Sequence, residues 1–240
     1  MRLVLWGTMS VILQDSIPDA QSGDPRLPGT QPCAPDDWLR VDETYAAQMA
    51  YRLQLLHDKP TAVLCEHPTA GREVLEEALH ILPGLGFAVS GAQITCPDRR
   101  IVQIDWAAPL KTLGQVVQED ICIMEKQGAE HMLTGAVLCF PANWRLAEKI
   151  NRPLIGIHAP VPEYDENIAR RVQRLFDGVQ VGRPMWRFNR LFYSDADLHQ
   201  PYKKVDGDVT PYIRSERQCI LRLPRTDAVV FTIHTFVLHA

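Results

Sequence analysis

The sequence lacks the features that would place the protein in a membrane or on nucleic acid. No apolar run approaches the ~20 residues that a membrane-spanning helix needs. The best candidate, Leu3 to Leu13, is interrupted by Gly7, Thr8 and Ser10 and makes a poor signal peptide. Positive charge is also scarce, because 25 Lys and Arg stand against 29 Asp and Glu, for a net charge of -4. We therefore expect no membrane insertion and no nucleic acid as the main partner, since nucleic-acid binding needs a strongly basic face.

Cysteine pairs and the common catalytic motifs are missing too. The sequence contains no CxxC, P-loop, GxSxG, HExxH or EF-hand loop, and no βαβ alternation with phosphate-binding glycines. These absences exclude the best-known nucleotide-binding, hydrolase and metalloprotease classes. Scattered cysteines in a chain of this length predict reduced thiols and a cytoplasmic protein. They are Cys33, Cys65, Cys96, Cys122, Cys139 and Cys219.

The composition that is present is typical of a folded globular protein. The chain has 240 residues, 46% hydrophobic and 22% charged, which predicts one domain with decorations. Its 18 prolines exceed the usual ~5% and indicate many irregular connections. Residues 14–36 are rich in Pro, Asp, Gln and Gly. We therefore expect an extended lead-in over residues 1–36 and a single domain over residues 37–240.

Periodicity predicts an α+β fold. Apolar residues at three- and four-residue steps predict helices over residues 42–59, 72–82, 109–120, 143–149 and 165–178, with Asn143 and Asp165 as caps. Strands are predicted over residues 121–124, 132–140, 153–157, 185–193, 213–223 and 228–238. The last of these is rich in Val, Ile, Phe and Thr and is expected to be central and buried. Residues 84–100 show no pattern and are predicted as loop. Helices that predominate in the first half of the sequence and an antiparallel sheet that follows in the second half define the α+β class.

His158 is the first candidate site residue. It lies between the apolar run Leu154 to Ile157 and the stiff segment APVP, residues 159–162. An imidazole held in this way could bind a metal or a cofactor iron through one nitrogen while a backbone carbonyl holds the other. The alternative is a buried histidine that bonds only to the backbone.

The predicted strand over residues 213–223 carries the second candidate. Alternation places Arg214, Glu216 and Gln218 on one face, with Arg222 further along it, and Arg217 on the opposite face. Charges on both faces of a strand with apolar neighbours are costly unless they are paired or used on a ligand. A ligand in a cleft against the sheet and ordinary cross-strand ion pairs therefore both remain open.

Arginines also alternate with aromatic residues in two places. The segment GRPMWRFNR, residues 182–190, contains Arg187, and Trp144 precedes Arg145 in the predicted short helix. Stacking on nucleic acid is disfavoured by the acidic total. Arginines near an apolar cavity suit carboxylate ligands, whereas packing in the core is the alternative role of the tryptophans.

Five collinear blocks resemble a known family. They are PRLPGTQPCAPDDWLRVDETYAAQMAYRLQLL (25–56), VQEDICIME (117–125), CFPANWRLAEKINRPLIGIHAPVPEY (139–164), GRPMWRFN (182–189) and RSERQCILRLPRTDAVVFTIHTF (214–236). With these blocks the chain resembles the DUF3445 family, which includes the α subunit of haem-dependent oxidative N-demethylase. The part of the sequence that resembles the family starts near Met9, so we expect Met1 to Thr8 to be an upstream extension without a role.

The resemblance implies a PAS-like fold that holds haem b through a protein ligand to the iron. It implies an enzyme that uses O2 to oxidise a small secondary amine, similar to dimethylamine, to a primary amine and formaldehyde. Electrons would come from NADPH through partner subunits that carry FMN and a 2Fe-2S cluster. The alternatives are a haem-based sensor of O2, NO or CO without turnover, and a relative that has lost haem and binds another small molecule.

The resemblance also suggests roles for the candidate residues. His158, in the block IHAPVPEY, is the expected axial ligand. Glu216 and Tyr164 are expected to hold a cationic amine, because a desolvated ammonium needs a carboxylate or hydroxyl partner. Arg217 and Arg222 are expected to polarise bound oxygen or to grip the haem propionates.

Two further arginines and one histidine complete the expected site. Arg187 and Arg145 are expected to contact the propionates, since guanidinium groups pair well with carboxylates. His234 departs from the family, whose corresponding block usually reads FTIRTY. This departure makes His234 a poor ligand candidate, and it is expected to alter the pocket or propionate binding.

Overall fold

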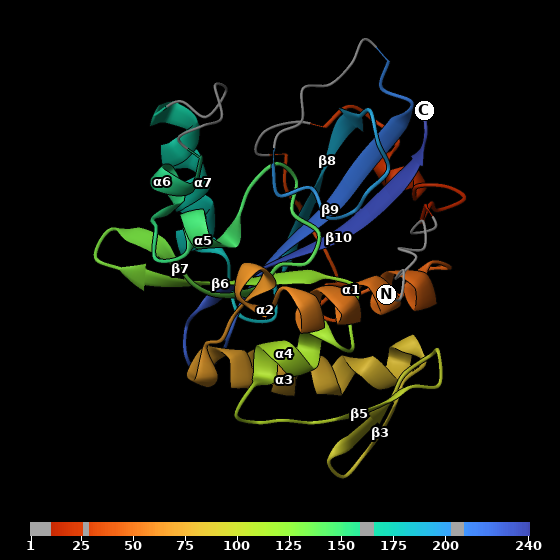
Figure 1. Ribbon diagram of the computed structural model, residues 1–240. Helices are drawn as coiled ribbons and strands as arrows, with labels where there is room; N and C mark the ends of the chain where they lie inside the picture. Colours follow the sequence, from red (N-terminus) through yellow and green to blue (C-terminus); the bar gives the residue numbers. More distant parts are fainter. Residues whose placement is uncertain (1–10, 26–28, 159–165, 203–208) are drawn as a thin grey trace, which may run out of the picture.

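A seven-stranded antiparallel sheet forms the centre of the protein (Figure 1). The computed structural model describes residues 11–25, 29–158, 166–202 and 209–240. The strand order is β1-β8-β9-β10-β6-β7-β2. The bounds are β1 Gln31–Pro32, β2 Leu64–Cys65, β6 Asp120–Gln127, β7 Glu130–Val137, β8 Met185–Tyr193, β9 Tyr212–Arg222 and β10 Val229–His239. The predicted α+β class is confirmed, and β10 lies between β9 and β6 as its composition predicts.

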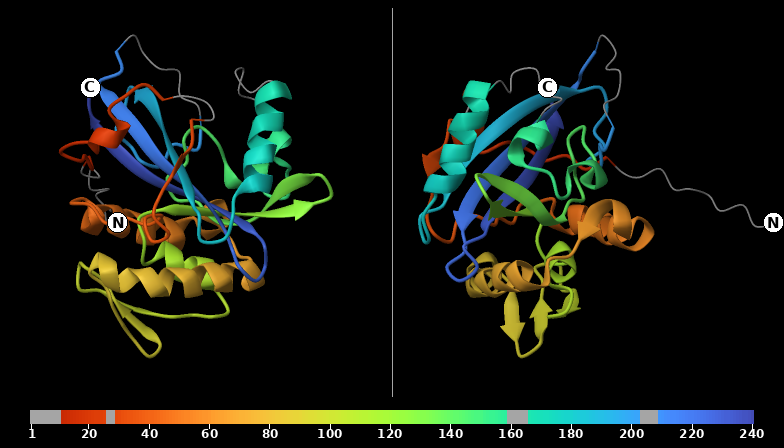
Figure 2. Two further views of the ribbon diagram at one scale, coloured as in Figure 1. Left: turned by 180° about the vertical axis from the view of Figure 1, so that it is seen from behind. Right: turned by 90° about the vertical axis from the view of Figure 1, so that its left-hand side faces the viewer.

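Helices cover both faces of this sheet. The helices are α1 Tyr45–Asp58, α2 Pro60–Val63, α3 Pro68–Ile81, α4 Pro109–Gly114, α5 Leu146–Lys149, α6 Leu154–His158 and α7 Glu166–Gly178, with 3-10 turns η1 Asp19–Gln21 and η2 Leu82–Leu85. In the parts of the chain that the structure describes, none of them is long and apolar enough to cross a membrane. Figure 2 shows α7 and α1 on opposite sides of the long strands.

The segment predicted as loop over residues 84–100 contains ordered strands instead. A second sheet is formed by β3 Ala88–Ser90, β4 Gln93–Thr95 and β5 Ile101–Gln103. Its buried residues Ile94 and Val102 lie directly opposite each other. Strands of three residues are too short to show alternation, so this prediction was wrong.

One strand prediction and two helix predictions need correction. The segment predicted as a strand over residues 153–157 is the helix α6, because a short apolar run fits either structure and its length cannot decide between them. The helix predicted to reach residue 120 ends at Gly114, where a β-carbon would lie 2.6 Å from the Val137 side chain. Asn143 adopts a φ of 63° and does not cap α5, which begins three residues later at Leu146.

The sheet separates two apolar cores. On the face that we call the α1 face, Cys219 and Val230 pack with residues of α1, α3 and α4. On the opposite face, which we call the α7 face, Ile220, Val229 and Phe231 pack with α5, α6 and α7. Because strand side chains alternate, neighbouring residues of β9 contact different cores.

A buried ion pair joins helix α1 to the sheet. Arg52 of α1 donates to Asp120 at 2.7 Å, and their side chains are 0% and 1% exposed. Arg52 also donates to the carbonyls of Gly114, Gln118 and Glu119. Asp120 accepts from the backbone amides of Cys139 and Phe140 at 2.7 and 2.8 Å. The pair thus holds the two segments that enter β6 and leave β7.

We expect Arg52→Met to lower the free energy of unfolding by roughly 3–5 kcal/mol, because it leaves the Asp120 carboxylate buried without its cation. Urea denaturation measures this change. The matched control is Arg72→Met, since Arg72 forms an ion pair with Glu76 while 57% exposed, and exposed pairs contribute about 1 kcal/mol or less. Equal losses in the two variants would contradict this role for Arg52.

Candidate functional site

Five polar side chains form a row on the α7 face of the sheet. Arg187 and Asn189 of β8 lie opposite Gln218 and Glu216 of β9, and Arg214 follows Glu216 along the same face. We call these five residues the polar row. The sequence pattern of β9 predicts the common face of Arg214, Glu216 and Gln218, and the register adds the two β8 residues.

Glu216 is the centre of the polar row and is 4% exposed. One carboxylate oxygen accepts from Nε of Arg214 at 3.0 Å. The other accepts from the amides of Asn189 at 2.8 Å and Gln218 at 3.2 Å. Three donors therefore fix the orientation of this carboxylate, which has about four acceptor positions in all.

Arg214 is fixed from the other side. Its guanidinium donates to the carbonyl of Leu198 at 2.9 Å and to that of Phe140. With its side chain 2% exposed, Arg214 is a fixed part of the fold. It neutralises Glu216 within the polar row.

Arg187 carries the second positive charge of the row. It donates to the Gln218 side chain, and its Nε is buried without a hydrogen-bond partner among the described residues. Burial lowers the pKa of the guanidinium, and the charge of Glu216 partly offsets this effect. Two arginines and one glutamate leave one positive charge in excess, so the row suits an additional carboxylate from a ligand.

Apolar side chains on the same face remain partly exposed. Trp144, Ile157, Met185 and Phe231 pack against the core of the α7 face but are only half-buried. Ile157 belongs to α6, whose last residue is His158. The side chain of His158 lies outside what the structure describes, and so does the whole of Tyr164. Their proposed roles stay predictions.

The other arginines singled out in the sequence lie elsewhere. Arg217 is on the α1 face, where it donates to Asp37 at 2.8 Å, so it does not share a face with Glu216. Arg222 is committed to the C-terminal end of α7, donating to the carbonyls of Phe176 and Val179 at 2.7 Å each. Arg145 is exposed and paired with Glu148. The structure therefore brings Glu216 and Arg187 together and separates them from these three.

A second polar cluster surrounds His234 on the α1 face. Its two ring nitrogens contact Glu119 at 2.8 Å and Asp42 at 3.1 Å. Burial alone would lower the pKa of His234, but the two carboxylates outweigh it and raise this pKa to about 9. His234 is therefore a cation at neutral pH, as the arginine of the family block would be. Glu119 lies in the family-like block VQEDICIME, which is the sequence signal for this residue.

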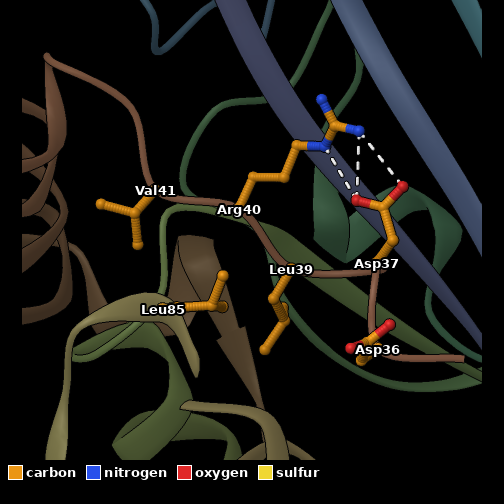
Figure 3. Close-up of a pocket in the computed structure, with 6 residues that line it drawn as sticks. All are labelled: Asp36, Asp37, Leu39, Arg40, Val41 and Leu85. Atoms are coloured by element: carbon orange, nitrogen blue, oxygen red, sulfur yellow. Dashed lines mark hydrogen bonds and ion pairs between the residues drawn. The ribbon is translucent and has the colours of Figure 1, made fainter. Parts of the chain in front are cut away.

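Two surface hollows lie beside this cluster. One, of about 360 Å³, is lined by Asp36, Asp37, Leu39, Arg40, Val41 and Leu85. Figure 3 shows the Arg40 and Asp37 side chains paired above its apolar wall. The other, of about 270 Å³, reaches His234 and Phe236. Both belong to the α1 face and neither is lined by the polar row.

The fold and the polar row define an α+β protein with a partly buried, charged surface on one face of an antiparallel sheet. The sequence model of the family described as "Haem-dependent oxidative N-demethylase, alpha subunit-like" matches residues 29–240. The chain belongs to this family. The resemblance seen in the sequence blocks is thereby confirmed.

We expect the free energy of unfolding to fall by on the order of 3 kcal/mol between pH 6.5 and pH 9 through His234. Its pKa is raised from 6.5 to about 9 on folding, so the stability that it contributes is complete below pH 6.5 and disappears as the pH passes 9. Urea denaturation across this range measures the loss.

His234→Arg is the control, because its charge does not change in this range. The hollow beside His234 offers room for the longer side chain. Cysteine ionisation affects both proteins equally, so the difference between their pH profiles isolates His234. Identical slopes for the two proteins would show that His234 carries no charge at neutral pH.

Proposed function

We propose that this protein is the haem-binding subunit of an oxidative N-demethylase and acts on a small secondary amine of the dimethylamine class. The observation that carries the proposal is that the buried carboxylate of Glu216 lies within the electrostatic influence of Arg187, the half-buried excess cation on the same face of the sheet. Family membership supports the haem-dependent character of the protein.

The residues present on the α7 face fit a haem. A haem has a broad apolar ring and two carboxylates, and the polar row borders partly exposed apolar side chains. Arg187 is the favoured propionate partner, because it has excess charge and a buried N–H without a partner among the described residues, whereas Arg222 and Arg145 are committed to other partners. His158 is the proposed axial ligand, since α6 packs on this face.

A bound haem would supply the oxidising chemistry with O2. The contribution of the chain itself is placement of the amine. We propose that Glu216 uses its remaining acceptor position to hold the ammonium group, because a charged amine away from water needs an anionic partner. Arg214, Asn189 and Gln218 keep this carboxylate oriented. Tyr164 is proposed as a second, hydroxyl partner of the amine.

Other subunits complete the proposed enzyme. The family description names an alpha subunit, which supports association with further chains. We propose a cytoplasmic reductase that passes electrons from NADPH through FMN and a 2Fe-2S cluster to this subunit. The PAS-like character of the fold belongs to the same proposal.

Hemin titration tests the cofactor. We expect the protein to develop a Soret band with hemin, His158→Ala to abolish the ligand-dependent spectrum, and Arg187→Gln to weaken hemin binding about tenfold or more. The tenfold value for Arg187→Gln follows because a hydrogen bond to a charged group contributes roughly 1.5–3 kcal/mol and about 1.4 kcal/mol corresponds to a factor of ten. Absorbance and iron content measure both effects.

Matched variants make the result specific. His57→Ala removes an imidazole that is 88% exposed, and Arg183→Gln removes an exposed guanidinium just before β8. Both are expected to bind hemin like the unaltered protein. A Soret band and iron content that are unchanged in His158→Ala would refute the ligand assignment, and a protein that takes up no hemin would refute the cofactor.

Titration with dimethylammonium tests Glu216. In the hemin-loaded protein, we expect Glu216→Gln to raise the Kd for the amine about tenfold or more, because the charge-assisted contact is lost. The change in the Soret band reports binding, and retained hemin affinity shows that the variant is folded. Glu73→Gln is the control, since Glu73 is equally buried but accepts from the backbone of Arg225 and Thr226.

Turnover separates the enzyme from a sensor. With a chemical reductant and O2, we expect formaldehyde from a secondary amine. Hemin binding without formaldehyde from any amine would favour a haem-based sensor. An unchanged affinity of Glu216→Gln for the amine would show that Glu216 does not bind the amine.

A further inference from the structure

Two cysteines that are far apart in the sequence meet on the α1 face of the sheet. β1 pairs with β8, and Trp186 of β8 lies opposite both Gln31 and Cys219. Cys33 directly follows β1, and its backbone amide donates to Pro184 at 3.0 Å. The segment after Cys33 then passes over Cys219, whose thiol lies 3.9 Å from the carbonyl oxygen of Asp37. The thiols of Cys33 and Cys219 lie close enough to interact as hydrogen-bond partners.

A buried guanidinium lies beside both thiols. Nη1 of Arg217 is 2.9 Å from the sulfur of Cys219, and its charge also acts on Cys33. Arg217 is held by Asp37 at 2.8 Å and packs over the ring of Trp186, 5.2 Å from the centroid. A fixed cation next to two sulfur atoms favours the thiolate form of whichever thiol gives up its proton first.

The two cysteines differ in exposure and acidity. Cys33 is half-buried between exposed neighbours, whereas Cys219 is 0% exposed. The contact with Cys219 lowers the pKa of Cys33, burial raises it and Arg217 lowers it, with a net decrease. The same contact and burial raise the pKa of Cys219. Cys33 is thus the accessible nucleophile and Cys219 the protonated thiol behind it.

We propose that Cys33 and Cys219 form a reversible redox pair that reacts with hydroperoxides. The Cys33 thiolate attacks one peroxide oxygen, the O–O bond breaks, and the departing oxygen takes a proton and leaves as water or an alcohol. The sulfur of Cys219 then attacks the resulting sulfenic acid of Cys33, and its proton leaves with the hydroxyl group as water. The two thiols lose two electrons in total and the peroxide gains them. A dithiol reductant reverses the step.

Oxidation would tie the N-terminal segment to the sheet. Residues 33–39 link β1 to Arg40, whose backbone amide donates to the Glu119 carboxylate at 2.7 Å. A disulfide from Cys33 to β9 would therefore fix the segment that borders the hollow of Figure 3. The polar row lies on the other face, so the pair acts independently of the proposed haem site.

Peptide mapping under non-reducing conditions tests the pair. The purified full-length protein is treated with one equivalent of hydrogen peroxide, digested after alkylation and analysed by mass spectrometry. We expect a linked peptide containing Cys33 and Cys219, two hydrogens lighter than the separate peptides, which dithiothreitol converts back. Cys65 is also partly exposed, and burial raises its pKa. Its thiol should stay reduced during the peroxide treatment and be alkylated afterwards.

Two variants distinguish the roles. In Cys219→Ser, Cys33 is expected to stop at the sulfenic acid, which dimedone traps, whereas Cys33→Ser should give no linked peptide and no trapped product at residue 219. Cys65→Ser is the control and should form the disulfide normally. The proposal is overturned if the unaltered protein keeps both thiols alkylatable after peroxide, or if Cys65 reacts before Cys33.

Discussion

The buried pair of Arg52 and Asp120 is the constraint on which the arrangement of the sheet depends. Both charges are removed from water, so each needs every partner that it has. Those partners are main-chain groups before β6 and after β7, which means that the ion pair fixes how the central hairpin meets helix α1. β10 pairs with β6, and β9 and β8 follow from β10. The position of the polar row is therefore set by a contact on a different part of the sheet.

Alternation along β9 gives the two faces different chemistry. Glu216 and Gln218 contribute to the polar row, while Arg217 and Cys219 contribute to the thiol pair on the other side. Each face buries charge. Arg214 pairs with Glu216 on the α7 face and Arg217 pairs with Asp37 on the α1 face, while Arg187 is the excess cation of the polar row. The carboxylate that we propose for amine binding and the thiol that we propose for redox chemistry therefore lie on one strand without direct contact between them.

Local patterns predicted the long elements and missed several of the short ones. β8, β9 and β10 are rich in aromatic and β-branched residues over nine to eleven positions, and that length makes alternation readable. α6 has five residues and β3 to β5 have three each, so their conformations are decided by packing that the local sequence does not contain.

The candidate site was predictable to the extent that it depends on alternation. The common face of Glu216 and Gln218 follows from β9 alone, but the addition of Asn189 needs the register between β8 and β9. Cys33 and Asp37 come from the N-terminal segment and meet β9 only through the fold. Arg222 could not be assigned from sequence, because its partners are carbonyls at the end of α7.

The ends of the sheet limit how another chain can attach. Both edge strands, β1 and β2, have two residues, and Pro32 in β1 has no amide hydrogen to donate. Beyond β1, Arg190 of β8 holds the carbonyls of Gln21, Ser22 and Gly23. Such short, interrupted borders discourage strand-by-strand extension from one molecule into the next. The partner subunit that we propose would then be recognised through side chains on helices and loops, and such contacts separate more easily than a shared sheet after an electron is delivered.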